Sequence, residues 1–258
     1  MKRYLAAFAV VASCATLGAQ SRSNGHPDLS GTWLFSIDLP PIALKKTTNG
    51  AATVKTIDAS GRRPAAENVA GALPSAPAPL YKPEFRAKVK DLIDHESKTD
   101  PVFYCDRPGI PRIGPPRRII QLPNEFVFLY EDISGDPYRI IPVGGQHKKD
   151  GNPSYYGDSV ARWDGNTLVV DVVNFVDSTW FGEDGYFHSD AMHVTERFWR
   201  SGANLVYQAT VDDPKVLASP WTMAPRVVKP STDGLEESPK CTESDAKLLV
   251  NNDHHGQR

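Results

Sequence analysis

The residues best suited to chemistry gather between positions 177 and 197, where polar and aromatic side chains are dense. A histidine near a carboxylate can transfer protons near neutral pH, as lyases, isomerases, hydratases and cyclases require. The predicted catalytic residues are Asp177, His188, His193 and Glu196. A polar and aromatic loop is also a common place for a ligand to be held. The predicted ligand-binding residues are Trp180, Tyr186, Arg197 and Tyr207.

A metal is a competing use of the same stretch. His188, Asp190 and His193 offer two imidazoles and a carboxylate, which could hold zinc or another divalent ion with one position open for water. Their spacing is not a strong metal signature, and histidine is common as a hydrogen-bonding residue. We therefore predict no bound metal. The sequence has no G-x-G-x-x-G motif and no Walker loop, so we also predict no cofactor.

The strand that carries this chemistry has two mixed faces. Because side chains alternate along a strand, His193, Thr195 and Arg197 share one face, and Glu196 lies on the other among Met, Val and Phe side chains. If the apolar face is the core, Glu196 needs a cationic partner such as Arg139 or loses its charge. If the other face lines a cup, His193 and Arg197 point inward. Either arrangement puts an ionisable group inside the fold.

The elements that would position these residues are mostly strands. Runs rich in β-branched and aromatic residues predict strands at 117–122, 125–132, 138–144, 159–163, 166–176, 191–200, 204–213 and 221–228. Asp164-Gly165 and Ser201-Gly202 predict two hairpin turns, because such turns need φ > 0. This succession predicts a mainly β fold, an antiparallel up-and-down barrel, with an open β-sandwich as the alternative.

Composition divides the chain into five predicted segments. They are a signal peptide (1–19), a first barrel strand (20–39), an insertion (40–116), the barrel (117–230) and a polar tail (231–258). The insertion is rich in Pro and Ala up to position 79. Its one predicted helix spans 83–95, because Pro83 suits a first helical position and the apolar residues that follow recur every three or four positions. Residues 100–116 contain five prolines and are predicted to be extended.

The amino-terminal segment predicts export. Lys2 and Arg3 precede an apolar run at 4–13 that is too short to span a bilayer. Cleavage near Ala19 would give a secreted or periplasmic protein, whereas a lipobox ending at Cys14 would give a lipoprotein. The apolar run continues to Leu17, which favours ordinary cleavage. No later apolar stretch is long enough for a membrane helix.

Removing the signal leaves two cysteines, Cys105 and Cys241. An even pair in an oxidising compartment predicts a disulfide, the alternative being two buried thiols. The chain has 258 residues with 29 Lys and Arg against 31 Asp and Glu. Because there is no basic excess, we exclude nucleic acid as a partner. Hydrophobic residues make up 40% and charged residues 23%, as in folded globular proteins.

The Gly31-x-Trp33 strand followed by hairpins resembles the lipocalin and wider calycin pattern. That resemblance implies that Trp33 packs across the floor of a closed barrel with Arg197 or Arg139 over it. Residues 27–33, 105–112, 163–170 and 188–200 together resemble a family of secreted bacterial proteins. This second resemblance implies a shared fold and export, and it carries over no catalytic residue.

Three functions of different classes follow. The favoured one is an exported barrel that binds an apolar or aromatic small molecule in its cup. The alternative is a cofactor-free acid–base enzyme, a lyase or isomerase, acting on such a molecule in the same barrel. The third is a surface-interaction protein that uses residues 40–79 as a docking arm. Fold alone does not choose among these functions.

Overall fold

The computed structural model of the protein describes residues 22–23, 25–34, 44–46, 52–54, 76–132 and 134–242. The predicted signal peptide, most of the Pro/Ala-rich stretch and the end of the tail lie outside these residues. Within the described part, no helix is long and apolar enough to cross a bilayer.

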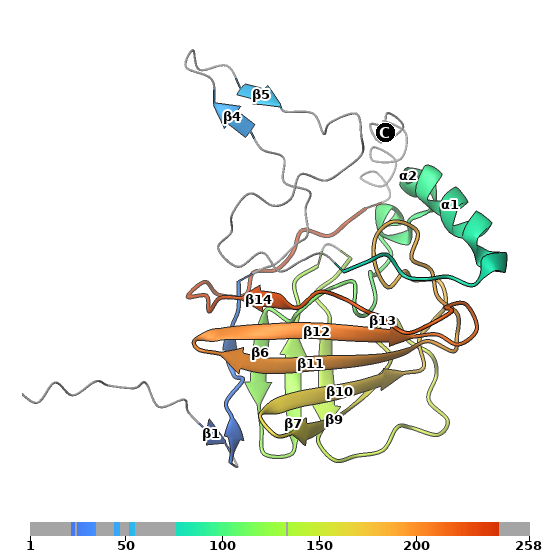
Figure 1. Cartoon of the computed structure of the whole chain (residues 1–258). Helices are drawn as coiled ribbons and strands as arrows, with labels where there is room; N and C mark the ends of the chain where they lie inside the picture. The colour runs from blue at the N-terminus through green and yellow to red at the C-terminus, as the bar shows by residue number, and fades with distance from the viewer. Residues whose placement is uncertain are drawn as a thin grey trace, which may run out of the picture.

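The larger of the two main sheets is an antiparallel meander with two short strands added at its edge (Figure 1). Its strands are β9 (Asp158–Asp164), β10 (Thr167–Val173), β11 (His193–Ser201), β12 (Asn204–Asp212), β13 (Trp221–Thr222) and β14 (Arg226–Val228). Both β13 and β14 pair with β12. Gly165 and Gly202 occupy the two predicted hairpin turns at φ of 57° and 59°, a backbone region that glycine adopts without steric cost.

The smaller sheet has four strands in the order β3-β6-β7-β8. They are β3 (Gly31–Thr32), β6 (Arg118–Gln121), β7 (Glu125–Leu129) and β8 (Tyr138–Pro142). Every neighbouring pair is antiparallel. In Figure 1, strands β10 to β12 run across β6 and β7, which lie behind them. The predicted mainly antiparallel β fold is therefore confirmed.

Isolated bridges link the edges of the two sheets. Val143, just after β8, bridges to Ala161 of β9, and Trp33, just after β3, bridges to Pro230. Continuous hydrogen-bonded ladders do not close a barrel among the described residues. The two sheets therefore face each other, and isolated bridges connect them at both edges.

The core lies between the two sheets. Along β7, Phe126 and Phe128 are buried while Val127 between them is half-buried, as the period of two requires. The ring of Phe128 meets that of Phe198 of β11 edge-on, with centroids 5.1 Å apart. Trp33 and Tyr207 are also fully buried. Large rings from both sheets thus fill one shared interior.

Short helices lie at one end of the sheets (Figure 1). They are η1 (Pro83–Phe85), α1 (Arg86–Asp94), α2 (Glu96–Thr99) and η2 (Pro101–Tyr104). The first two confirm the predicted helix at 83–95. The prediction of extended chain over 100–116 is wrong at its start, because Pro101 suits a first helical position and the Asp100 carboxylate accepts the Val102 amide at 3.0 Å.

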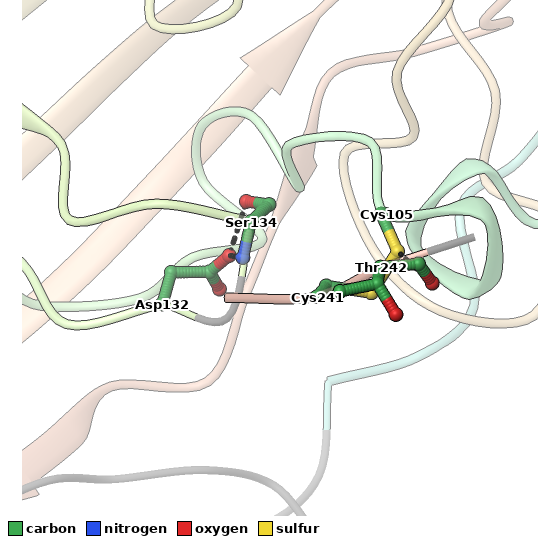
Figure 2. Close-up of a disulfide and its surroundings, with 5 residues drawn as sticks. All are labelled: Cys105, Asp132, Ser134, Cys241 and Thr242. Atoms are coloured by element: carbon green, nitrogen blue, oxygen red, sulfur yellow. Dashed lines mark hydrogen bonds between the residues drawn. A yellow bond between two sulfur atoms is a disulfide. The ribbon is translucent and has the colours of Figure 1, made fainter. Parts of the chain in front are cut away.

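Three smaller features complete the fold. Cys105 and Cys241 lie at disulfide-bonding distance, with sulfur atoms 1.99 Å apart, which confirms the predicted pair (Figure 2). The bond joins the loop after η2 to the carboxy-terminal segment. Two short ladders pair β1 (Arg22–Ser23) with β2 (His26–Pro27), and β4 (Leu44–Lys46) with β5 (Ala52–Val54).

Candidate functional site

The two faces of β11 separate His193 from Glu196. Val194, Glu196 and Phe198 are fully buried, whereas His193 and Arg197 on the other face are half-exposed. The first of the two predicted arrangements is therefore the correct one, in which the apolar face is the core. His193 and Glu196 cannot act on one bound molecule, because the sheet lies between them.

Glu196 is paired with an arginine from the other sheet. Arg139 of β8 places Nη2 2.7 Å from Oε2 of Glu196, and the two side chains are 4% and 0% exposed. The guanidinium also donates to the Ser159 hydroxyl, at 2.7 and 3.3 Å, and to the Tyr130 hydroxyl at 3.1 Å. The Tyr207 hydroxyl donates to Oε1 of Glu196 at 3.1 Å. We call these five residues the interior cluster.

Burial and the charges of the ion pair both shift the pKa values of the interior cluster. Burial alone would lower the pKa of Arg139, but the Glu196 charge and contacts with Tyr130 outweigh it, so the pKa lies above its ordinary value. Burial, reinforced by the Glu196 charge, raises the pKa of Tyr207 well above normal. Burial also raises the pKa of Tyr130. Both phenols therefore stay neutral beside a fixed cation.

Two buried oxygen atoms have no hydrogen-bond partner among the described residues: Oη of Tyr156 and Oε2 of Glu196. Oε2 is within ion-pair distance of Arg139, but the contact lacks the alignment of a hydrogen bond. Tyr156 stacks on Tyr130, with ring centroids 6.5 Å apart. A buried polar atom without a partner costs about 1–3 kcal/mol. Among the described residues the interior thus holds two buried donors without a hydrogen-bond partner, the Tyr156 hydroxyl and Nε1 of Trp33, while Oε2 of Glu196 is held by the ion pair alone.

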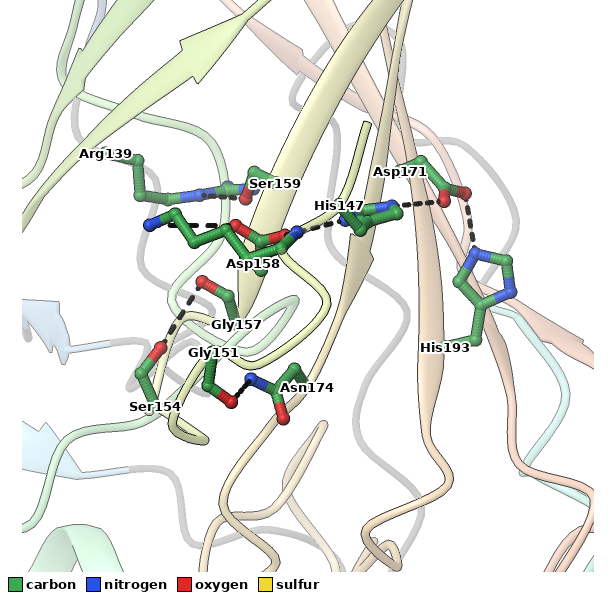
Figure 3. A network of polar contacts seen from close by, with 11 residues as sticks. Arg139, His147, Gly151, Ser154, Gly157, Asp158, Ser159, Asp171, Asn174 and His193 are labelled. Carbon is green, nitrogen blue, oxygen red and sulfur yellow. Dashed lines mark hydrogen bonds and ion pairs between the residues drawn. The ribbon is translucent and has the colours of Figure 1, made fainter. Parts of the chain in front are cut away.

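A second polar network lies on the outer face of the larger sheet (Figure 3). His147 contacts Asp158 through Nδ1 at 3.0 Å and Asp171 through Nε2 at 2.8 Å, and Asp171 also contacts Nε2 of His193 at 2.6 Å. Burial would lower the pKa of His147, but its two carboxylate partners raise it above the ordinary value. Burial would raise the pKa of Asp171, but hydrogen bonds from His147 and His193 lower it.

His188 braces the loop between β10 and β11. Its Nδ1 lies 2.8 Å from the Ser189 carbonyl and so carries the proton, which leaves Nε2 to accept from the Thr179 hydroxyl at 2.7 Å. Burial lowers the pKa of His188. Asp190 instead pairs with Lys215. The three residues weighed as metal ligands thus have separate partners, and no group of three or more His, Cys, Asp or Glu in the described part is arranged to hold a metal.

The other predicted site residues are spread over the fold. Trp180 is buried in the β10–β11 loop, and Tyr186 of the same loop stacks on Phe181 with centroids 5.7 Å apart. Asp177 is exposed and Arg197 faces outward. Of the eight predicted catalytic and ligand-binding residues, only Glu196 and Tyr207 belong to the interior cluster.

The arginine over Trp33 is neither of the two that were expected. The Arg200 guanidinium lies 4.4 Å from the Trp33 ring centroid and donates to the Asp28 carbonyl at 2.9 Å. The alternation of β11 explains this correction. Position 200 shares the inner face with Glu196, whereas position 197 points outward. Arg139 is engaged by Glu196.

Sequence reasoning missed several members of both networks. Tyr130 continues the inward alternation of Phe126 and Phe128, and Ser159 lies two positions before buried Ala161 on the same face of its strand. A polar side chain at a position that the alternation assigns to the core could therefore have identified both residues. His147 lies in a polar segment without periodicity, and no sequence signal marks it.

A scan against protein-family models, a search of curated proteins and a search of solved structures each found no match.

Proposed function

We propose that the protein is an exported small-molecule carrier whose two sheets work as a lipocalin-like barrel. The ligand would lie between the sheets beside the interior cluster. The proposal rests on the buried Arg139–Glu196 pair, in which Oε2 of Glu196 accepts no hydrogen bond, and on the buried Tyr156 hydroxyl, which lacks a partner among the described residues and whose ring stacks on Tyr130.

Stability alone is a poor reason for such a cluster. Removing two charges from water is costly, and apolar residues of similar size often replace a buried ion pair with no loss of stability. Unpaired groups add to that cost. A bound molecule that donates to Glu196 Oε2 and accepts from Tyr156 Oη would satisfy both. Ligand binding therefore accounts for a feature that packing does not.

The chemistry of the cluster favours a neutral ligand. The charges of Arg139 and Glu196 offset each other, and the raised pKa values of Tyr130 and Tyr207 keep those phenols uncharged. A further charge would be buried without a counter-charge, which is strongly unfavourable. The rings of Phe128 and Phe198 suit an aromatic or apolar body. The proposed ligand is a neutral aromatic or apolar compound with at least one hydrogen-bonding group.

Two further observations support the barrel and the export. The sheet edges approach each other at Val143–Ala161 and Trp33–Pro230, and Arg200 covers Trp33 as the calycin resemblance implies for a late-strand arginine. The Cys105–Cys241 pair is of the kind that persists in oxidising compartments.

An acid–base enzyme in the same interior is the second candidate. A specific contact favours it: Oε1 of Glu196 accepts from the Tyr207 hydroxyl at 3.1 Å while Oε2 is held by the ion pair with Arg139, so a carboxylate base and a phenol acid would be adjacent. On this proposal His188 and His193 take no part. Turnover lost in Glu196→Gln with binding retained would identify the enzyme.

N-phenyl-1-naphthylamine, a neutral aromatic amine that fluoresces in apolar surroundings, tests the binding site. We expect the wild type to bind this probe and Arg139→Met/Glu196→Leu to bind it at least tenfold more weakly. His193→Gln, on the outer face, is the matched control and should keep the wild-type affinity. Equal affinity in all three proteins would place the probe elsewhere and contradict the proposal.

A further inference from the structure

The outer face of the smaller sheet carries three cross-strand rows of mainly apolar residues. The register aligns Ile120, Val127 and Ile140 in the middle row. One flanking row contains Arg118, Leu129 and Tyr138, and the other contains Leu122, Glu125 and Pro142. The buried residues of β6, β7 and β8 alternate with these and point to the core.

Large apolar side chains on this face are open to solvent. Ile120 is 36% exposed, Leu122 40%, Ile140 56% and Tyr138 66%. A single exposed apolar side chain is ordinary, but adjoining ones on a rigid sheet are typical of an interaction surface. We call this surface the apolar sheet face.

The two flanking rows carry opposite charges. Arg118 stands in one row and Glu125 in the other, and neither has an ion-pair partner among the described residues. They cannot pair within one chain. Arg118 lies opposite Leu129, and Glu125 is four residues from Leu129 along β7, a separation of roughly 13 Å.

We propose that the apolar sheet face binds a second copy of this chain about a two-fold axis. Two copies that touch face to face must have their axis in the plane of contact, and an isologous contact needs a self-complementary surface. An axis along the middle row exchanges the two flanking rows between copies. Ile120, Val127 and Ile140 then meet their own counterparts.

This arrangement also brings Arg118 of each copy close to Glu125 of the other, so that opposite charges meet. The row of Arg118 lies over the row of Glu125 from the second copy, and the two residues are offset by one strand, about 4.8 Å. The pairing occurs twice in the dimer. Sheets that pack face to face keep their strands near alignment at about 10 Å, which leaves room for the Ile and Tyr side chains to interdigitate. The two chains therefore supply both an apolar centre and a charged border to each other.

Sedimentation velocity of the mature protein over a concentration series measures the association. We expect a reversible dimer in the wild type. Ile140→Lys should weaken the dimer by about a hundredfold or more, because it buries a charge at the centre. Val227→Lys alters an exposed apolar residue of the other sheet, 47% exposed against 56% for Ile140, and should dimerise as the wild type does. Unchanged circular dichroism in both variants verifies folding.

A charge exchange tests the axis itself. Arg118→Glu and Glu125→Arg should each be monomeric alone, because each places like charges across the border. An equimolar mixture should dimerise, since each copy then meets opposite charges on its partner. A wild type that stays monomeric at all concentrations overturns the proposal. So do single variants that dimerise like the wild type, or a mixture that stays monomeric while the wild type dimerises.

Discussion

Arg139 and Glu196 belong to different sheets and meet inside the core, with Nη2 and Oε2 2.7 Å apart. The pair therefore connects the two halves of the fold, and the Ser159, Tyr130 and Tyr207 hydroxyl groups complete the connection. It is also the most deeply buried ion pair in the described part of the chain. The cost of burying its charges is compensated only while both partners are present.

Removing one partner should be far worse than removing both. Arg139→Ala leaves the Glu196 carboxylate buried without its counter-charge, and we expect a loss of about 3–5 kcal/mol in the free energy of unfolding. Arg139→Met/Glu196→Leu removes both charges with similar volume and should recover at least half of that loss. Urea denaturation of the three proteins measures this. A double variant as unstable as the single one would contradict the coupling.

The burial of Glu196 could not be predicted from the sequence, although the strands around it could. The strands and turns were predictable, because Asp164-Gly165 and Ser201-Gly202 mark hairpins and β-branched runs mark their arms. The inward face of β11 was not predictable, because each face mixes apolar and ionisable residues. The choice depends on Arg139, which lies more than fifty residues away in the chain and on another sheet. Only the ion pair with Arg139 offsets the free-energy cost of burying the Glu196 carboxylate.

The outer network was equally hidden from local patterns. His147 joins Asp158 and Asp171 across two strands, and no spacing rule relates a loop histidine to those positions. The arginine over Trp33 was misassigned for a related reason. The expectation named Arg197 or Arg139 without knowing which face of β11 was buried, and Arg200 is the arginine whose guanidinium lies over Trp33.

His147 should make the protein less stable as the pH rises. Its two carboxylate partners raise its pKa in the folded state above the ordinary 6.5. The stabilisation is therefore complete below pH 6.5 and is lost as the pH rises through the folded-state pKa. We expect His147→Gln to flatten this part of the profile, measured as the urea midpoint from pH 6 to 9. An unchanged slope in the variant would show that the network does not titrate as described.

His188 should have the opposite effect in a lower pH range. Burial lowers its pKa in the folded state below 6.5. The unfolded chain then binds the proton more readily, so stability falls as the pH drops below 6.5. We expect the wild-type melting temperature to fall between pH 6.5 and 5.5, and His188→Gln to fall less over that interval. Parallel profiles for the two proteins would contradict a buried neutral imidazole.

The disulfide should stabilise the fold through the long loop it closes. Cys105 and Cys241 are 136 positions apart, and closing a loop reduces the entropy of the unfolded chain. Cys105→Ser/Cys241→Ser should lose about 2–4 kcal/mol in guanidinium unfolding, and reduction of the wild type should have the same effect. Detection of both Cys105 and Cys241 as free thiols in denatured, unreduced protein would show that the bond does not form.

Native mass spectrometry of the protein, purified from the cells that produce it and from their medium, measures whether a ligand is bound. We expect the wild type to carry one neutral small molecule, and Arg139→Met/Glu196→Leu, purified in the same way, to lack it. His193→Gln should retain the molecule, because its side chain lies on the other face of β11. A wild type of bare polypeptide mass, or the same molecule on the double variant, would contradict a ligand site at Arg139 and Glu196.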